Sequence, residues 1–293
     1  MRITNQMIAN DAIQQMTSNL EALNRYQQQA STGKQFQNAS DNPIAACASL
    51  SLNSSIQTIQ GYMDTASHAG DWLDANDSAL QQIEDAATQA INTVTTGLTD
   101  TENAGDRVNL ATTIGTLTSQ AVDLANSTQN GQYIFAGTKV NTKPFTLNAD
   151  GSVTYNGDPN TMQRSLGPGQ SVTINAPGGT TFQAFFDALS AAKTALTNND
   201  TATLRTQLDG LQSALDTIDQ FRAVLGISNQ QVQQASDSLQ IAQTGTQSLL
   251  TKKEDINMAE GLTMVQSQTN TYQAVLEVSQ RAVSTLSLFD YLK

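Results

Sequence analysis

The sequence is poor in the residues that usually supply cross-links, catalysis and metal binding. Its 293 residues include one cysteine and one histidine, and only 14% of them are charged. With Cys47 alone, no disulfide can form within the chain, so packing must hold the fold together. Any catalytic triad or histidine metal site would need His68, whose acidic neighbours recur at helical steps typical of a solvated face: Asp64, Asp71 and Asp74. We therefore expect no enzyme activity, no metal site and no cofactor.

Long apolar runs and clusters of positive charge are also missing. No stretch approaches the roughly 18 consecutive apolar residues of a membrane helix, and polar residues interrupt positions 1–16, unlike a signal peptide. The net charge is -12 and no run of lysine and arginine occurs, whereas nucleic acids and anionic membranes attract clustered cations. We expect no nucleic-acid partner, no membrane insertion and no cleavable signal peptide, so any export would use another route.

Proline is scarce and unevenly placed. All five prolines lie at positions 43, 144, 159, 168 and 177, and the interval 131–181 holds four of them together with eight of the 18 glycines. An interior proline costs a helix roughly 3 kcal/mol, so the proline-free stretches 44–143 and 178–293 can form long helices. The distribution predicts two helical arms that flank a turn-rich insert.

The arms contain a regular apolar repeat. In the first arm, apolar or small residues recur every seven positions, as in the seam of a left-handed coiled coil: Leu52, Ile59, Ala66, Leu73, Leu80, Ala87 and Val94. The pattern breaks at Gly97 and over 99–105 and resumes over 110–124, which predicts a helical hairpin. Helix is expected again over 182–196, and the longest arm then shows a 4-3 spacing at Leu204, Leu208, Leu211, Leu215, Ile218, Leu225, Val232 and Leu239.

Two unusual residues lie within the first of these helices. Cys47 has no adjacent cation to activate its thiol and is most simply a small apolar packing residue. Trp72 lies beside Leu73 and is either a core residue or a contact between subunits.

The insert has short β-prone runs in place of the apolar repeat. Turn signals at 150–151, 156–157 and 167–169 separate them, and the runs lie at 133–135, 145–147, 153–155 and 172–174. The pair Asp150 and Gly151 lacks the acidic ladder of a calcium loop and instead predicts a hairpin turn. We expect a small antiparallel β domain, tied to the helices by aromatic residues within 133–138 and 182–186.

The two ends of the chain carry apolar seams of their own. We expect these seams to pack in an axial core through Ile13, Met16, Leu20, Leu23, Met258, Leu262, Val265, Tyr272, Leu276, Val283 and Leu286. Because the ends carry few charges, they can approach neighbouring copies closely, although an ordinary monomeric coiled coil is the alternative. The sequence thus predicts a discontinuous terminal domain (1–40 and 252–293), a helical rod domain (41–130 and 182–251) and a β-rich insert (131–181).

Several motifs resemble those of a known family. Residues 31–34 (STGK) followed by 39–43 (ASDNP) resemble the link between the first two helices of the bacterial flagellin superfamily. Three further segments look more like the hook-filament junction members of that superfamily: 1–4 (MRIT), 130–138 (NGQYIFAGT) and 286–292 (LSLFDYL). Relatives usually carry aspartate where this chain has Asn257, so the hydrogen bonds at that point are not inferred from the family.

The resemblance implies a mainly α fold, with an elongated coiled-coil rod built from both termini and a small antiparallel β domain inserted. It implies a structural subunit that polymerises at the hook-filament junction. The implied partners are neighbouring subunits, an adjacent hook-associated protein, filament flagellin and an export chaperone. Export would use the flagellar type III channel and end in the extracellular flagellum. Two alternatives stay open, a filament flagellin and a secreted coiled-coil adhesin whose β insert is the binding head.

Overall fold

The computed structural model describes residues 5–290, with side chains for residue 7 and residues 10–281. The chain separates into two compact units, one made of Met1–Thr58 and Gln243–Lys293 and the other of Ile59–Ala242. The first unit joins both ends of the chain, and the second contains the β-rich insert. The three-domain division expected from the sequence is finer than this and stays a prediction.

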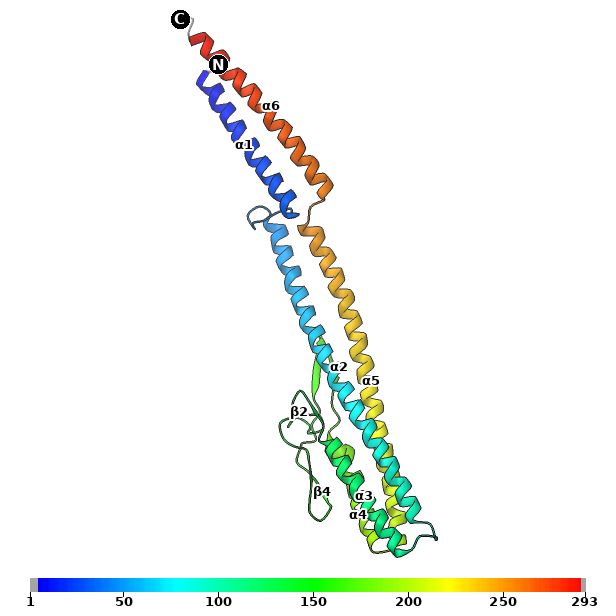
Figure 1. The fold of residues 1–293 in the computed structure, drawn as a ribbon. Coiled ribbons are helices and arrows are strands. Elements are labelled where there is room, and N and C mark those ends of the chain that lie inside the picture. The colour runs from blue at the N-terminus through cyan, green and yellow to red at the C-terminus, as the bar shows by residue number, and fades with distance from the viewer. Residues whose placement is uncertain (1–4, 291–293) are drawn as a thin grey trace. The chain divides into compact units, whose positions relative to one another are not determined.

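The described residues form a mainly α-helical fold, as the sequence predicts (Figure 1). The helices are α1 (Asn5–Thr32), α2 (Pro43–Gly97), α3 (Ala104–Ala125), α4 (Gly178–Thr197), α5 (Thr201–Glu254) and α6 (Met258–Asp290). The first helical arm therefore ends at the glycine where its apolar repeat breaks.

Capping residues explain where the helices begin. Pro43 opens α2, at a position where its missing N–H costs nothing, and the Asn42 side chain accepts a hydrogen bond from the Ala45 amide at 3.1 Å. Asn103 and Asp106 form a capping box at the start of α3. Both helix starts thus have a local cause in the sequence.

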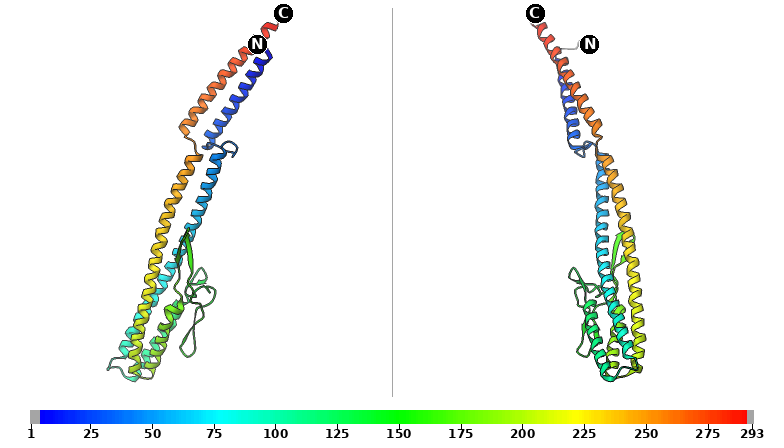
Figure 2. Two further views of the ribbon diagram at one scale, coloured as in Figure 1. Left: turned by 180° about the vertical axis from the view of Figure 1, so that it is seen from behind. Right: turned by 45° about the vertical axis from the view of Figure 1, so that its right-hand side comes forward.

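The core of the unit Ile59–Ala242 is shared by α2, α3, α4 and α5. From residue 66 onward, every predicted heptad position of α2 is buried: Ala66, Leu73, Leu80, Ala87 and Val94. The facing helix α5 buries Leu204, Leu211, Ile218, Leu225 and Val232. Figure 2 shows α3 and α4 alongside these parts of α2 and α5, so the long seams are covered by a second pair of helices.

The structure decides how Trp72 and Cys47 are placed. Trp72 is 8% exposed and belongs to this core rather than to an open surface. Cys47 is exposed, so the expectation that it packs in the interior was wrong. The continuous core begins only at Ala66, and the first turns of α2 lie before it.

A buried arginine links three segments of the same unit by hydrogen bonds. Arg107, on α3, donates from Nε to the Gly97 carbonyl at 2.8 Å and from a terminal nitrogen to the Thr99 carbonyl at 3.1 Å. Its other terminal nitrogen donates to Oδ1 of Asn199 at 2.6 Å. One side chain therefore connects the end of α2, the α2–α3 loop and the turn between α4 and α5.

The insert forms three separate antiparallel strand pairs rather than one small sheet. The pairs are β1 (Thr128–Gln129) with β2 (Gln132–Tyr133), β3 (Phe145–Leu147) with β4 (Val153–Tyr155), and β5 (Gln163–Gly167) with β6 (Gln170–Thr173). The small antiparallel β insert expected from the sequence is therefore confirmed, and within it the β3–β4 hairpin packs on α3 and α4. Strand β5 had no signal in the sequence, since its residues are mostly polar.

The turn between β3 and β4 is the predicted hairpin turn. Oδ1 of Asp150 accepts from the Ser152 amide at 2.9 Å and from the Ser152 hydroxyl at 2.7 Å, and these bonds hold the pKa of Asp150 below its usual value. Gly151 has a φ of +86°, a conformation that glycine adopts without strain.

Aromatic side chains attach the insert to α4, as the sequence predicts. The rings of Phe135 and Phe182 meet edge to face with centroids 4.8 Å apart. The ring centroid of Phe145 lies 5.2 Å from that of Phe186 and 5.1 Å from that of Tyr155. Because such pairs add to the burial of apolar area, the insert is anchored by its side chains rather than by strand pairing to a larger sheet.

Replacing Arg107 with methionine should destabilise the unit Ile59–Ala242. The substitution keeps the apolar stem but leaves the carbonyl of the buried Gly97 without its donor, so we expect a loss of about 2 to 4 kcal/mol in the free energy of unfolding, measured by urea denaturation. The matched control is Arg205→Met, at an exposed position of α5, which should change stability by less than about 0.5 kcal/mol. Equal midpoints for the two variants would contradict the proposed role of Arg107.

Candidate assembly surface at the chain ends

Helices α1 and α6, from opposite ends of the sequence, run side by side within one unit (Figure 1). The Gln268 side chain donates to the Asn19 carbonyl at 3.3 Å and to its side-chain oxygen at 3.0 Å. Leu23 is buried in the contact, with 8% of its surface exposed. The expectation that the two termini pair with each other is therefore confirmed.

The apolar residues expected in an axial core are only partly covered by this pairing. Of the nine whose side chains are described, Leu23 is buried, Met16, Val265, Tyr272 and Leu276 are half-buried, and Ile13, Leu20, Met258 and Leu262 are exposed. Val283 and Leu286 lie outside the described side chains. Their packing between copies of the chain stays a prediction.

Apolar exposure is unusually high along both helices. The exposed large apolar side chains are Met7 (57%), Ile13 (62%), Leu20 (41%), Met258 (47%), Leu262 (58%), Met264 (44%) and Val278 (67%). Exposed apolar side chains that gather on one structure, rather than scatter singly, mark interaction surfaces. A two-helix pair cannot bury all sides of both helices, so this surface requires a further partner to be covered.

Five threonine hydroxyls on the same helices are already bonded within their own helix. Each donates to the carbonyl four residues earlier, and the donors are Thr17, Thr32, Thr263, Thr269 and Thr271. The helix surface therefore combines exposed apolar groups with hydroxyls whose donors are satisfied.

A set of ion pairs, which we call the clamp, joins Lys34, just after the end of α1, to Glu254 and Asp255, just before the start of α6. The Lys34 ammonium is 2.9 Å from Oε2 of Glu254 and 2.7 Å from Oδ1 of Asp255. The hydrogen bond to Asp255, followed by that to Glu254, raises the pKa of Lys34 above its usual value of 10.5. Lys34 therefore stays charged across the physiological range and links segments that are 221 positions apart.

Backbone bonds reinforce the clamp. The Gln35 amide donates to the Glu254 carbonyl at 2.6 Å, and the Ile256 amide donates to the Gly33 carbonyl at 2.9 Å. Gly33 has a φ of +71° and ends α1, a left-handed position that favours glycine. The chain entering α2 and the chain leaving α5 are thus tied by a short two-stranded bridge.

The loop that follows the clamp explains the second half of the family motif. The Asp41 carboxylate accepts from the amides of Asn38 at 3.0 Å and Gln37 at 3.2 Å, and these bonds lower the pKa of Asp41. At the other side of the bridge, Oδ1 of Asn257 accepts from the Ala259 amide at 3.2 Å at the start of α6. Asparagine therefore performs the capping role that an aspartate would perform there.

The sequence analysis missed the pairing of Lys34 with Glu254 and Asp255. The motif containing Lys34 was noted, but nothing in the local pattern joins it to the acidic pair. The available signal was weak: Lys34 lies in a stretch with few charges, but Glu254 and Asp255 directly follow Lys252 and Lys253, so the sequence offers them other cations.

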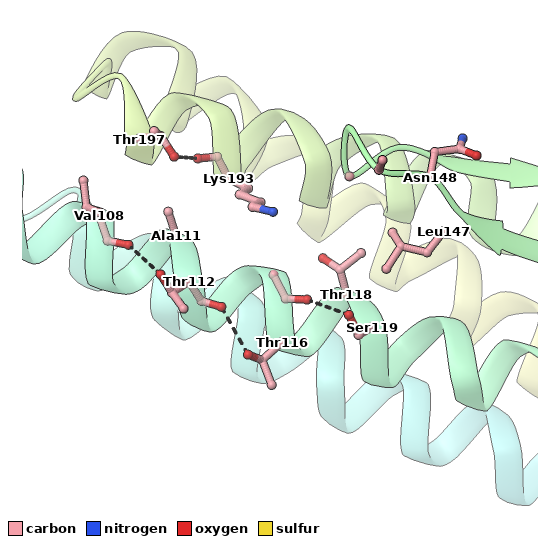
Figure 3. Close-up of a pocket in the computed structure, with 13 residues that line it drawn as sticks. Val108, Ala111, Thr112, Thr116, Thr118, Ser119, Leu147, Asn148, Lys193 and Thr197 are labelled. Atoms are coloured by element: carbon pink, nitrogen blue, oxygen red, sulfur yellow. Dashed lines mark hydrogen bonds between the residues drawn. The ribbon is translucent and has the colours of Figure 1, made fainter.

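A hollow of about 560 Å³ lies elsewhere, in the unit Ile59–Ala242, between α3, α4 and the β3–β4 hairpin. Figure 3 shows hydroxyls of α3 along one wall, opposite Lys193. Thr112, Thr116 and Ser119 donate to carbonyls of their own helix. No acid, histidine or cysteine lines this hollow, so it offers no paired nucleophile and base.

The described residues hold no group of three or more His, Cys, Asp or Glu side chains arranged to bind a metal ion. None of the described helices combines the length and apolar content that a membrane-spanning helix needs.

Comparisons with known proteins agree with this architecture. Residues 3–140 match the family described as the bacterial flagellin N-terminal helical region. Flagellar hook-associated protein 3 of Escherichia coli (strain K12) is 29% identical over 254 residues, which cover 77% of this chain and 79% of that protein. The protein of the same name from Salmonella typhimurium is 30% identical over 183 residues, covering 62% of this chain and 57% of that protein. The crystal structure of Bacillus cereus FlgL, 21% identical, superposes with a TM-score of 0.61 over 69% of this chain and 99% of the other.

The paired chain ends, the helical unit and the inserted hairpins define a mainly α-helical fold like that of Bacillus cereus FlgL. The chain is similar to the flagellin N-terminal helical region over residues 3–140 and, over most of its length, to flagellar hook-associated protein 3.

Replacing Lys34 with methionine should weaken the clamp modestly. Its side chain is 44% exposed, so the expected loss is at most about 1 kcal/mol in the free energy of unfolding, measured by chemical denaturation. Because the folded state raises the pKa of Lys34, its contribution is present at neutral pH and disappears as pH rises past the folded value. The difference between wild type and Lys34→Met should thus be equal at pH 7 and 9 and vanish well above 10.5. The exposed Lys252→Met serves as control, and an equal loss there would show that general charge, not the clamp, matters.

Proposed function

We propose that this chain is a structural subunit of the bacterial flagellum at the hook-filament junction, where it polymerises through its terminal helices. The names of its relatives and the match to the flagellin N-terminal region support this assignment. The observation that carries the mechanism is the set of apolar side chains that α1 and α6 leave exposed after pairing with each other.

The work of such a subunit is mechanical. Fully burying one large apolar side chain contributes about 1.5 to 3 kcal/mol, so several residues of this surface, including Ile13 and Leu262, can supply strong association between copies. Few charges lie on the chain ends: residues 1–40 carry three basic and two acidic side chains, and residues 257–293 carry two basic and three acidic ones. Packing neighbouring ends therefore desolvates few charges and meets little repulsion.

The negative charge on residues 41–110 suits an outer surface. Residues 41–110 carry ten acidic side chains and one basic one. The partners we infer are neighbouring copies of the chain, an adjacent hook-associated protein on one side and filament flagellin on the other. An export chaperone that holds α6 before assembly and export through the flagellar type III channel complete the proposal, which places the protein in the extracellular flagellum. No catalytic step is assigned to it.

Two other assignments, a filament flagellin and a secreted adhesin, predict different behaviour in the cell. A filament flagellin would grow long polymers by itself, whereas a junction subunit stops at a short layer. A secreted adhesin would leave motility unchanged when its gene is deleted. The deciding experiment is a null strain: for a junction subunit, hooks form while filament subunits leak into the medium.

The substitution Leu262→Asp should abolish assembly without unfolding the monomer. Leu262 is 58% exposed in the isolated chain, so a carboxylate there stays in water, but burying it against a neighbouring subunit would cost several kcal/mol. We expect an unchanged melting temperature and loss of motility when the variant complements the null strain.

Gln273→Asp, which adds the same charge at an exposed polar position of α6, is the matched control and should restore motility. A Leu262→Asp variant that assembles normally would contradict the proposed surface. A variant whose monomer also melts early would show instead that Leu262 supports the fold of the free chain.

A further inference from the structure

A second hollow, of about 350 Å³, lies in the unit Ile59–Ala242 between α2 and the insert. Polar side chains from three parts of the chain line it: His68 and Asp71 from α2, Gln129, Asn130 and Gln132 from the β1–β2 hairpin, and Arg164 from β5. We call it the Trp72 hollow, because Trp72 also lines it.

The polar groups of the Trp72 hollow are not used by the fold. Within the part of the chain that the structure describes, the six side chains named above make no hydrogen bond or ion pair. Elsewhere in the unit, comparable side chains are engaged: Arg222 pairs with Asp77 and Glu84, each at 2.8 Å, and Asn229 donates to Asp74 at 2.8 Å. The Trp72 hollow therefore brings together donors and acceptors that form no hydrogen bond or ion pair with other described residues.

The backbone holds three of these groups in place. Asn130 and Gly131 both have positive φ, +52° and +78°, as in the tight turns that join two strands. Gln129 pairs with Gln132 in the β1–β2 register, so both flank that turn. Three amide side chains are consequently presented together, on a hairpin of fixed geometry.

The inner wall of the hollow is apolar. Trp72 and Ile174 are 8% and 1% exposed, so they line the hollow from the core side. The indole Nε1 of Trp72 is buried and has no hydrogen-bond partner. Buried donors without a partner are uncommon in folded proteins, because each loses its hydration without compensation.

This combination suits a polyhydroxyl ligand. A carboxylate accepts from two neighbouring hydroxyls, a guanidinium donates to their oxygens, and primary amides do both. An aromatic wall with a few converging polar groups, in a volume at the lower end of small-molecule sites, fits one or two sugar rings. We propose that the Trp72 hollow binds a saccharide through vicinal hydroxyl groups, held by Asp71 and Arg164. The net charge of -12 disfavours a nucleic acid at the same place.

The 560 Å³ hollow beside Lys193 is a useful contrast. Its hydroxyls on Thr112, Thr116 and Ser119 are bonded to their own helix, and it lacks both a carboxylate and an aromatic wall. Size alone therefore does not define the proposed site, and Lys193→Gln gives a matched control in the same unit.

The chain reports on this site without a label, because Trp72 is its only tryptophan. The experiment titrates the full-length monomer with lactose, maltose, cellobiose and sialyllactose up to about 50 mM, a range that detects millimolar dissociation constants. Glycerol at matched concentration controls for solvent effects, and saturation-transfer NMR on the same samples detects binding that leaves the indole emission unchanged. We expect a saturable change in emission with at least one of the sugars and none with glycerol.

The variants decide whether the Trp72 hollow is responsible. Asp71→Asn and Arg164→Gln alter exposed side chains, so the fold should persist by circular dichroism, and each should weaken binding roughly ten-fold or more. Lys193→Gln should bind like the wild type. The proposal is overturned if no sugar gives an emission change or saturation transfer, or if binding survives both substitutions. The inference goes beyond the junction function, and because it is tested on the monomer, either can fail without the other.

Discussion

The path of the chain depends on one contact, the clamp between residues 33–35 and 254–256, because it fixes where α1 ends and where α6 begins. It combines two backbone hydrogen bonds with the ion pairs of Lys34 to Glu254 and Asp255. Everything from α2 to α5 lies in the loop that it closes, and α1 and α6 lie outside it. Bringing together positions 221 apart costs loop entropy that a few exposed bonds cannot offset alone. The apolar seams of α2 and α5 must therefore supply most of the free energy that closes this loop. The clamp fixes the points at which α1 and α6 leave the loop.

Most of the helical architecture could be predicted because its signals are periodic or local. Proline positions, capping residues such as Asn42 and Asn103, and the seven-residue repeat from Leu52 to Val94 each act over a few turns. The strand pairs were harder, since β5 has a polar sequence and the six strands form three separate pairs rather than one sheet. Distant pairings of charged side chains have no period at all, which is why the partners of Lys34 were missed. Likewise, the unused polar groups around Trp72 come from segments that only the fold brings together.

The two units bury their apolar residues to different extents. In Ile59–Ala242, core positions such as Leu80, Ile114 and Phe182 are fully buried by neighbours within the chain. In the unit that contains the chain ends, Leu23 is buried while Ile13 and Leu262 are largely exposed. The core of Ile59–Ala242 is thus completed within the chain, whereas the unit that contains the chain ends leaves large apolar side chains of α1 and α6 exposed. A chain divided in this way can keep a stable fold before assembly and reserve its unburied surface for contact with other copies.

The internally bonded hydroxyls of the terminal helices have a consequence for such contacts. When a polar surface is dehydrated, each donor that loses water must find another acceptor or leave the interface destabilised. Thr17, Thr263, Thr269 and Thr271 already donate within their own helices, so a neighbouring subunit can displace water from them without providing acceptors of its own. Association through this surface should consequently tolerate small changes in register between neighbours, and respond only weakly to ionic strength.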